Sequence, residues 1–506
     1  MNNQTFVEMK NISKSFGEVK ANYNVNLNVK KGEVHALLGE NGAGKSTLMN
    51  MLSGIYSPDS GSIFIHGNEV KINSPKESIK LGIGMIHQHY KLVDVITAKE
   101  NITLGQKGKF FINQKKLSKE ISKISEKFHL DINPDKKIYN MSIGEKQTVE
   151  ILKVLYRGAD ILILDEPTAV LTPQETKKLF NIIRNMKEQG CAVIIITHKL
   201  NEVMEISDRV TVLRKGQTVE TVTTSETTAK ELTDLMVGRS VDLAIERVIT
   251  NPSETLLEIN NLVAKDKDKV VKIDNISFNL KKGEILGVAG VAGSGQKELC
   301  EAIAGLYSVE AGEIKYLDEN LVGKTPSDII KRGISMSFIP EDRLGMGLVA
   351  SMDMVDNLLL KSYKNQEGLL VKRKPLENKC EELIEKLDIK TPGIHHPIKQ
   401  LSGGNIQKVL LGREIDLSPH VLITAYPVRG LDIGASHTIY DLINEEKKKG
   451  VGIIFVGEDL DVLLELCDRI MVLCDGKVTG ILDATETTKE EVGLLMAGQE
   501  NKKGVS

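Results

Sequence analysis

A glycine-rich loop at residues 39–47 constrains the fold of this chain more than any other part of its sequence. It fits the pattern G-x-x-x-x-G-K-[ST] and consists of Gly39, Glu40, Asn41, Gly42, Ala43, Gly44, Lys45, Ser46 and Thr47. The largely apolar run 33–38 before it predicts a buried strand, and the apolar spacing of 48–52 after it predicts a helix. A glycine-rich turn that contained a lysine by chance would not need a strand before it and a helix after it. We therefore expect an α/β fold built around a phosphate-binding loop.

The residue types of this loop suit a nucleotide with magnesium. Glycines allow the backbone N–H groups to wrap around a phosphate, and the following helix N-terminus adds positive potential. The Lys45 side chain can reach the β- and γ-phosphates, and the Ser46 hydroxyl can bind Mg²⁺. The sequence thus predicts a nucleoside triphosphate and Mg²⁺ as ligands.

The composition narrows the class of protein. A chain of 506 residues predicts two or more domains. With 66 Lys and Arg against 69 Asp and Glu, it offers no basic field for nucleic acid. No apolar run approaches the roughly 18–20 residues that span a bilayer, and the polar start shows no signal peptide. The five scattered cysteines predict free thiols in a reducing compartment, hence a cytoplasmic chain that reaches a membrane only through a partner.

The sequence repeats itself once. Residues 29–33 resemble 280–284, which lie 251 positions later, and 207–210 resemble 467–470, which lie 260 positions later. A period this long indicates two copies of a whole domain. We predict a first domain at 1–245, a linker at 246–255 around Pro252, a second domain at 256–498 and a polar tail at 499–506.

Polar residues follow the buried strands predicted in the first copy. The β-branched runs 161–164 and 192–196 predict central strands of a parallel sheet, whose carboxyl ends collect the side chains of a nucleotide site. Asp165 and Glu166 follow the first strand, where the aspartate can hold Mg²⁺ and the glutamate can orient or deprotonate a water. His198 follows the second and could contact the γ-phosphate, although a lone histidine is usually structural.

Gln88 and Phe16 of the first copy are two further candidates for the nucleotide site. Gln88 ends another apolar run and could bind Mg²⁺ and the attacking water. The flanking His87 and His89 suggest a metal site only weakly, because a third ligand is not in view. Phe16 could stack on a base or pack in the core, and the residue alone leaves both interpretations open.

Each copy also has a serine–glycine turn at a predicted helix start. The first contains Ser142 and Gly144, and the second contains Ser402, Gly403 and Gly404, followed by Gln407. The serine can cap the helix and the glycines bring N–H groups close to an anion. One such turn is a weak signal, whereas one in each repeat is a strong signal.

Taken together, these residues resemble the nucleotide-binding domains of ABC transporters over essentially the whole chain. The resemblance implies two tandem P-loop NTPase domains, each with a mostly parallel central sheet, an antiparallel β subdomain and a helical subdomain. It implies ATP as substrate, stacked on Phe16, with Mg²⁺ held by Ser46, Gln88 and Asp165. Catalysis would rest on Lys45, Gln88, Glu166 and His198.

The double-domain layout resembles the ATPases of bacterial importers for simple sugars and nucleosides. Such importers imply two membrane-embedded permease subunits and, indirectly, an extracytoplasmic solute-binding protein, with the ATPase peripheral at the cytoplasmic face of the membrane. The segment 90–101, which follows Gln88, is the predicted permease contact.

The second copy departs from the family pattern at its chemical residues. Its loop, 290–297, carries Gln296 where the first copy has Lys45. The other replacements are Lys297 for Ser46, Ala425 and Tyr426 for Asp165 and Glu166, Glu341 for Gln88, Glu458 for His198 and Asp266 for Phe16. In the family, each nucleotide lies between the loop of one domain and the signature turn of the other. That geometry implies one hydrolytic site per chain, completed by Ser402, Gly403, Gly404, Gln407 and Asp432.

The solute is indicated only indirectly. Residues 87–93 and 425–432 resemble the nucleoside-importer subgroup, so nucleosides are the favoured solute and ribose- or galactose-type sugars are the alternative. A soluble, ribosome-acting ABC protein would have two competent sites and a basic extension, and a repair-type protein would have a long coiled coil. The sequence has no basic block and no sustained heptads to support either.

Overall fold

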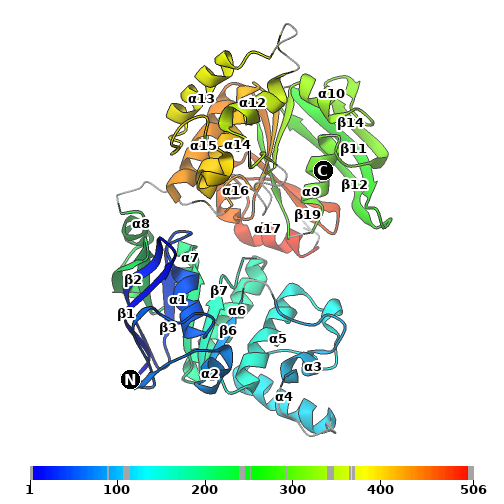
Figure 1. Ribbon diagram of the computed structural model, residues 1–506. Helices are drawn as coiled ribbons and strands as arrows, with labels where there is room; N and C mark the ends of the chain where they lie inside the picture. Colours follow the sequence, from blue (N-terminus) through cyan, green and yellow to red (C-terminus); the bar gives the residue numbers. More distant parts are fainter. Residues whose placement is uncertain are drawn as a thin grey trace. The chain divides into compact units, whose positions relative to one another are not determined.

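The computed structural model describes two compact units, Met1–Asp242 and Leu243–Ser506, which are treated separately below (Figure 1). The described residues are 4–87, 90–105, 114–169, 171–238, 245–250, 252, 254–291, 293–338, 347–363, 366, 371–429, 431 and 433–499. Within these ranges no helix combines the length and apolarity needed to cross a bilayer.

The first unit contains a four-stranded antiparallel sheet in the order β2-β1-β4-β5. Its strands are β1 (Thr5–Phe16), β2 (Val19–Lys30), β4 (Ser60–Ile65) and β5 (Asn68–Val70). In β2 the side chains of Val25, Leu27 and Val29 are buried and alternate with more exposed neighbours. This period-two pattern is that of a sheet with one face packed on a core.

A six-stranded sheet in the order β10-β9-β3-β8-β7-β6 forms the centre of the first unit. All neighbouring strands are parallel except the edge strand β10, which pairs antiparallel with β9. The strands are β3 (Val34–Leu38), β6 (Ile83–Ile86), β7 (Ile161–Asp165), β8 (Ala192–Thr197), β9 (Arg209–Arg214) and β10 (Gln217–Thr223). The parallel pairings confirm the predicted parallel sheet, whose carboxyl ends meet at one edge, and β3, β8 and most of β7 are buried as central strands are.

Helices cover this sheet and form the helical subdomain. They are α1 (Lys45–Leu52), α2 (Pro75–Lys80), α3 (Ala98–Thr103), α4 (Gln114–Phe128), α5 (Ile143–Tyr156), α6 (Pro173–Glu188), α7 (Leu200–Ile206) and α8 (Ala229–Val237). In α4 the side chains of Leu117, Ile121 and Phe128 are buried, which is the apolar stripe expected of an amphipathic helix.

The second unit repeats this architecture, with sheet orders β12-β11-β14-β15 and β16-β17-β18-β13-β19-β20. Its strands are β11 (Thr255–Lys265), β12 (Val271–Lys281), β13 (Ile285–Ala289), β14 (Val309–Tyr316), β15 (Glu319–Asn320), β16 (Ile334–Phe338), β17 (Val421–Ala425), β18 (Gly452–Val456), β19 (Arg469–Cys474) and β20 (Lys477–Asp483). Its helices are α9 (Gln296–Ile303), α10 (Pro326–Lys331), α12 (Met354–Ser362), α13 (Lys374–Lys386), α14 (Gly403–Asp416), α15 (Ile433–Lys448), α16 (Leu460–Leu466) and α17 (Lys489–Met496). The two copies read from the sequence are thus two copies of one fold.

The segment 245–250, which overlaps the start of the predicted linker, belongs to the second unit and is bonded to distant parts of it. The carbonyls of Glu246 and Val248 accept hydrogen bonds from Asn444 and from the buried Lys447, and Arg247 donates to the Leu464 carbonyl. The Thr250 hydroxyl donates to the Gly283 carbonyl over 2.6 Å. These backbone partners are far away in sequence, so the local Pro252 signal could not reveal them.

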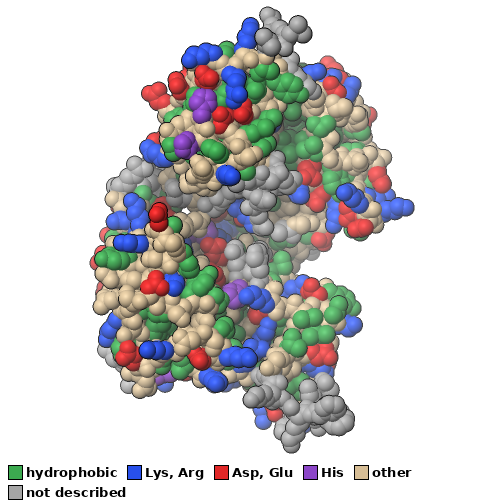
Figure 2. Space-filling model, viewed as in Figure 1, with side chains coloured by type: hydrophobic (Ala, Val, Ile, Leu, Met, Phe, Trp, Pro, Cys, Tyr) green, Lys and Arg blue, Asp and Glu red, His purple; other side chains and the backbone are tan. Residues whose placement is uncertain are grey.

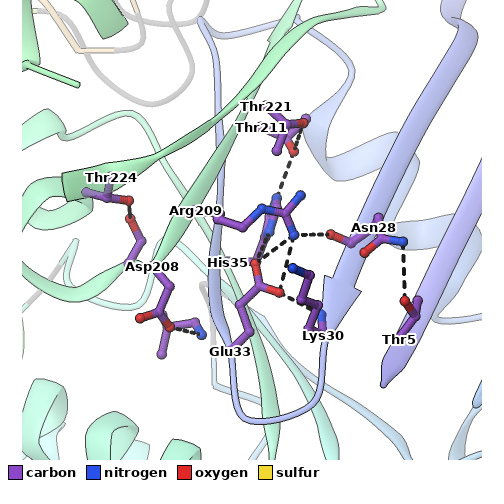
Figure 3. Close-up of polar contacts among 12 residues, drawn as sticks. Thr5, Asn28, Lys30, Glu33, His35, Asp208, Arg209, Thr211, Thr221 and Thr224 are labelled. Carbon is purple, nitrogen blue, oxygen red and sulfur yellow. Dashed lines mark hydrogen bonds and ion pairs between the residues drawn. The ribbon is translucent and has the colours of Figure 1, made fainter. Parts of the chain in front are cut away.

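A buried polar group supports the strand that leads into the loop. His35, fully buried on β3, lies 2.8 Å from a Glu33 carboxylate oxygen through Nδ1 and 2.7 Å from the Thr211 hydroxyl through Nε2 (Figure 3). Arg209 also pairs with Glu33. Burial lowers the pKa of His35, although Glu33 opposes that shift, so the ring is neutral at pH 7 and joins β3 to β9 by hydrogen bonds.

The surface carries both signs of charge. On the face shown in Figure 2, basic and acidic side chains are interspersed on each unit, in keeping with the net charge of −3. All five cysteines are free, as the sequence predicted.

Candidate functional site

The glycine-rich loop of the first unit joins β3 to α1 and is held where side chains do not fit. A Cβ on Gly39 would lie 2.4 Å from the Leu213 carbonyl oxygen, and one on Gly44 would lie 2.4 Å from that of Ala21. Gly44 has φ 95°, and its carbonyl accepts a hydrogen bond from Asn22. Gly42, at φ 82°, has nothing within 4 Å of its Cβ position. The loop is therefore fixed from behind by β2 and β9 and open at Gly42.

Lys45 starts α1 with its side chain drawn back into the loop. Its Nζ donates to the carbonyls of Gly39 and Glu40, over 2.6 and 2.9 Å. Burial lowers the pKa of Lys45, while the nearby Glu166 and Asp165 act to raise it. The ammonium group thus sits close to both predicted acids. Ser46 and Thr47 follow in the first turn of α1, with Ser46 exposed.

The polar ends of β7 and β8 come together as the sequence predicted. Asp165 ends β7, and the next residue, Glu166, has φ 46° and donates its N–H to the Ile196 carbonyl of β8. His198 follows β8, with Nδ1 2.9 Å from a Glu166 carboxylate oxygen. One edge of the sheet therefore carries the cation of Lys45, two carboxylates and an imidazole.

The two carboxylates have opposite pKa shifts. Burial, reinforced by the charge of Glu166, raises the pKa of Asp165 to about 6. Burial acts in the same direction on Glu166, but the hydrogen bond and charge of His198, with Lys45 and Lys199, bring the pKa of Glu166 below its usual value. Glu166 is therefore ionised at neutral pH and can accept a proton or orient a water.

A residue that the sequence analysis missed joins the two strand ends. Glu202 of α7 accepts hydrogen bonds from the hydroxyls of Thr168, after β7, and Thr197, at the end of β8. Lys199 pairs with the same carboxylate. Glu202 lies in an ordinary helical sequence, so only the spatial arrangement reveals that it holds the segments carrying Glu166 and His198.

Phe16, the predicted base-stacking residue, ends β1 with 44% of its surface exposed. That exposure is unlike a core aromatic and leaves a ring face available for stacking. Tyr56 lies against it, with ring centroids 5.2 Å apart in an edge-to-face arrangement, and Lys14 Nζ lies 5.7 Å from the Phe16 ring centroid. Tyr56 is a second aromatic at this position that the sequence analysis did not assign to the site.

The donor set fits a hard divalent cation. Mg²⁺ prefers oxygen ligands and is usually held by one or two carboxylates together with substrate phosphates. Asp165 is a partly buried carboxylate beside Glu166, and Ser46 is an exposed residue at the start of α1. Gln88, predicted as a further ligand, and Asp432 of the second copy both lie outside the described residues.

The serine–glycine turns of the two units differ in one carboxylate. In the first unit Glu175 accepts the N–H of Gly144, over 3.3 Å, and also caps α6 with Thr172. In the second unit the equivalent residue is Ala435, and of the described residues a Cβ on Gly404 would meet Leu431, at 3.4 Å. The first turn therefore binds a carboxylate of its own unit, and Ala435 has no carboxylate to offer the second.

Ser402 is the residue before α14, which begins at Gly403, and its hydroxyl accepts a hydrogen bond from the Asn405 amide. Gln407 was predicted to bind nucleotide, but its side chain is fully buried and donates to the Arg429 carbonyl over 2.9 Å. The structure gives it a supporting position beneath the loop that follows β17.

The glycine-rich loop of the second unit has the backbone conformation of the first loop but lacks its lysine. Gly293 and Gly295 have φ of 88° and 101°, and Gln296 donates to the Val291 carbonyl over 3.2 Å. Tyr426 has φ 54°, in the place of Glu166, and burial raises its pKa to about 12, so the hydroxyl stays neutral. Arg429 packs over this ring and pairs with Glu458. No carboxylate ends β17, because Ala425 occupies that position.

A cavity of about 160 Å³ lies beside the site in the first unit, between β6, α2 and α5. His87, the residue before Gln88, lines it together with Lys91, Glu150 and Lys153. The cavity therefore lies directly next to the segment that the sequence predicts as the contact with a permease.

Comparisons with known proteins agree with this geometry. The ABC transporter family model matches residues 23–169 and 273–427. The chain is 43% identical to the nucleoside import ATP-binding protein NupA of Lactococcus lactis over 504 residues, 98% of this chain and 99% of that one. It is 45% identical to the guanosine import ATP-binding protein NupO of Bacillus subtilis over 98% of both chains. It is 39% identical to the galactose/methyl galactoside import ATP-binding protein MglA of Yersinia pestis over 96% of both.

The raised pKa of Asp165 predicts a pH-dependent stability. Because this acid ionises near pH 3.8 in the unfolded chain and near pH 6 in the folded one, stability falls as the pH rises from about 4 to about 6 and is level above that. Asp165→Asn, which mimics the protonated acid, should stabilise the unliganded chain by roughly 2 kcal/mol at pH 7.5 and by about half as much at pH 5. Thermal unfolding at the two pH values measures this, and an equal effect at both would contradict it.

Proposed function

Since the chain belongs to the ABC transporter family, we propose that it is the ATP-hydrolysing subunit of an importer that brings nucleosides across the cytoplasmic membrane. The observation that carries the proposal is the convergence of Lys45, Asp165, Glu166 and His198 at one sheet edge, in a chain similar over its full length to nucleoside and guanosine import subunits.

The residues of the first unit suit phosphoryl transfer to water. Loop N–H groups and the Lys45 ammonium bind the phosphates and offset their charge. Glu166 orients a water and accepts its proton as the water oxygen bonds to the γ-phosphorus and the bond to the bridging oxygen breaks. His198, bonded to one Glu166 oxygen, orients the carboxylate. ADP and phosphate are the products.

Ser46 and Asp165 are the described residues that would hold Mg²⁺, with Gln88 as the further predicted ligand. When bound, this ion supplies charge neutralisation at the phosphate oxygens. Phe16 would stack on the adenine, with Tyr56 against its edge.

We further propose that only one loop of the chain hydrolyses ATP, and that the Ser402 turn with Asp432 completes its site. Two observations support this. The second loop has lost its lysine and its metal carboxylate, as Gln296 and Ala425 show. The first turn has its Gly144 N–H occupied by Glu175, whereas the second has Ala435 in that place. If the two copies had lost residues independently, we would not expect the loop with Lys45 in one copy and the turn without a competing carboxylate in the other.

Two membrane-embedded permeases, served by an extracytoplasmic solute-binding protein, are the proposed partners. They would hold the chain at the cytoplasmic face of the membrane. Segment 90–101 is the proposed contact in the first unit, because it links the region of Gln88 to α3 of the helical subdomain.

Nucleosides are favoured over simple sugars because residues 87–93 and 425–432 resemble the nucleoside subgroup and the full-length relatives include nucleoside and guanosine import subunits. The similarity to a galactose/methyl galactoside import subunit supports sugars as the second candidate.

Replacing the two loop residues separately tests the single working site. Lys45→Ala should reduce ATP hydrolysis by at least 100-fold, since the cation that offsets phosphate charge is lost. Gln296→Ala, at the equivalent position of the second loop, should leave it within about twofold. Steady-state phosphate release measures both, and equal losses would refute the assignment.

The two turns provide a second matched pair. Ala435→Glu places a carboxylate where Glu175 lies in the first unit, so it should occupy the Gly404 N–H and reduce hydrolysis at least tenfold. Glu175→Ala should leave hydrolysis nearly unchanged and cost about 1 kcal/mol through the lost cap of α6. Phosphate release and thermal unfolding separate the two effects; a larger catalytic loss from Glu175→Ala would assign the working turn to the first unit.

Uptake in cells tests the solute. A strain lacking this chain should take up labelled guanosine or adenosine at most one-tenth as fast as the parent, and the wild-type chain, but not Lys45→Ala, should restore uptake. Labelled ribose and galactose are the controls. Loss of sugar uptake with intact nucleoside uptake would make the sugar importer the correct assignment.

A further inference from the structure

The carboxylate of Glu202 in α7 bridges the segments that follow β7 and end β8. One of its oxygens accepts the Thr168 hydroxyl, and the other accepts the Thr197 hydroxyl at 3.3 Å. Thr168 lies two positions after Glu166. Thr197 lies directly before His198. One side chain of α7 therefore joins the two segments that carry the residues proposed to activate water.

This bridge is shielded from water. Thr168 and Thr197 have 4% and 2% of their surface exposed, and the Glu202 side chain has 12%. Lys199 contributes to the same group in two ways. Its Nζ pairs with Glu202 at 3.3 Å, and its backbone N–H donates to the Thr197 hydroxyl over 3.0 Å. Because hydrogen bonds to a carboxylate are charge-assisted and stronger than neutral ones, the bridge restricts the movement of both segments.

The second unit has small or apolar residues in place of the bridge. The equivalents of the two threonines and the glutamate are Val428, Gly457 and Val462. Val428 and Val462 are partly buried and pack against an apolar core of that unit. Replacing buried charged groups by apolar residues of similar size often leaves stability unchanged or raises it. The glutamate of the first unit therefore needs an explanation other than stability.

The strand ends fold in the same way without the bridge. In the first unit Glu166 donates its N–H to the next strand, and its carbonyl accepts the Ala169 N–H at 3.2 Å. In the second unit Tyr426 makes the same two bonds, and its carbonyl accepts the Arg429 N–H, also at 3.2 Å. The bridge is therefore not needed to form this turn. It occurs in the unit with Glu166 and His198 and is absent from the described strand ends of the unit that has lost both.

We propose that Glu202 is a positioning residue for ATP hydrolysis. It holds the segments on both sides of the hydrogen bond between Glu166 and His198, so that the Glu166 carboxylate keeps the direction in which it orients a water. A misplacement of about 1 Å at such a group can lower the rate roughly 100-fold. This inference rests on the proposed roles of Glu166 and His198 and adds to them the group that fixes their relative position.

The main variant gives the first unit the apolar residues of the second, Glu202→Val together with Thr168→Val. Changing both avoids a buried hydroxyl without an acceptor. In the full-length chain it should lower kcat for ATP hydrolysis roughly tenfold or more and leave the KM for ATP within about threefold, because Lys45 and its loop are unchanged. Glu202→Gln, whose amide can still bond both hydroxyls, should keep roughly a third or more of the wild-type kcat.

A background without the Glu166 carboxylate shows whether the bridge acts through it. In single-turnover hydrolysis of labelled ATP, Glu166→Gln should lower the rate roughly 100-fold. Adding Glu202→Val and Thr168→Val should lower the remaining rate by less than about twofold, because the group that they position is already gone. A further loss as large as in the wild-type background would overturn the proposal.

Glu205→Val is the matched control on the same helix. Glu205 is an exposed acid three positions further along α7, where it pairs with Arg184. Its loss should change kcat by less than about twofold. Thermal unfolding checks the fold of every variant. If the double variant does not fold, Glu202→Asp takes its place with the same expected loss, because the shorter carboxylate cannot reach both hydroxyls.

The outcomes separate this proposal from the proposed function. A folded double variant with the kcat of the wild type, or one in which only the KM for ATP changes, would overturn the positioning role and leave the hydrolytic site intact. An undiminished rate in Glu166→Gln would overturn the proposed role of Glu166 and this inference with it.

Discussion

The whole site depends on one close approach of backbone to backbone. The loop at residues 39–47 passes so near the carbonyls of Leu213 and Ala21 that only glycine fits at Gly39 and Gly44. This contact fixes the loop to β9 and β2 and turns Lys45 toward the carbonyls of the loop, near Asp165 and Glu166. A Cβ at either glycine would push the loop away from the sheet. Lys45 would then no longer lie close to the acids at the neighbouring strand ends.

The internal repeat separates what the fold requires from what the chemistry requires. Glu166 has φ 46°, which could suggest strain at a functional site, but its counterpart Tyr426 has φ 54° in a unit that has Ala425 and Tyr426 in place of the two acids. Both residues donate their N–H to the neighbouring strand, at Ile196 and Val456. The left-handed backbone therefore belongs to the architecture of the strand end, and only the side chain placed on it decides whether the unit can activate a water.

The sequence predicted the residues whose role follows from local pattern. A loop between a strand and a helix located Lys45, and buried runs of β-branched residues located Asp165, Glu166 and His198, because parallel strands bring their carboxyl ends together. The roles of Glu175 and Glu202 were not predicted. Their partners Gly144 and Thr168 are more than 30 positions away in sequence, and no local motif connects them. The contacts of 245–250 were not predicted either, because they are made largely by backbone carbonyls, which every residue has.

Two neighbouring strands, β6 and β7, connect the cavity with the nucleotide site. Gly84 and Met85 of β6 line the cavity, and β6 pairs in parallel with β7, with Ile86 opposite Leu164, the residue before Asp165. A side chain pressed against Gly84 would therefore act on the strand next to the one that carries both acids. In the second unit the same path would start at Ser335, held by Glu414, and end at Ala425, which has no acid to move. The unit in which this strand leads to a carboxylate is the one whose residue at this place, Gly84, carries no side chain.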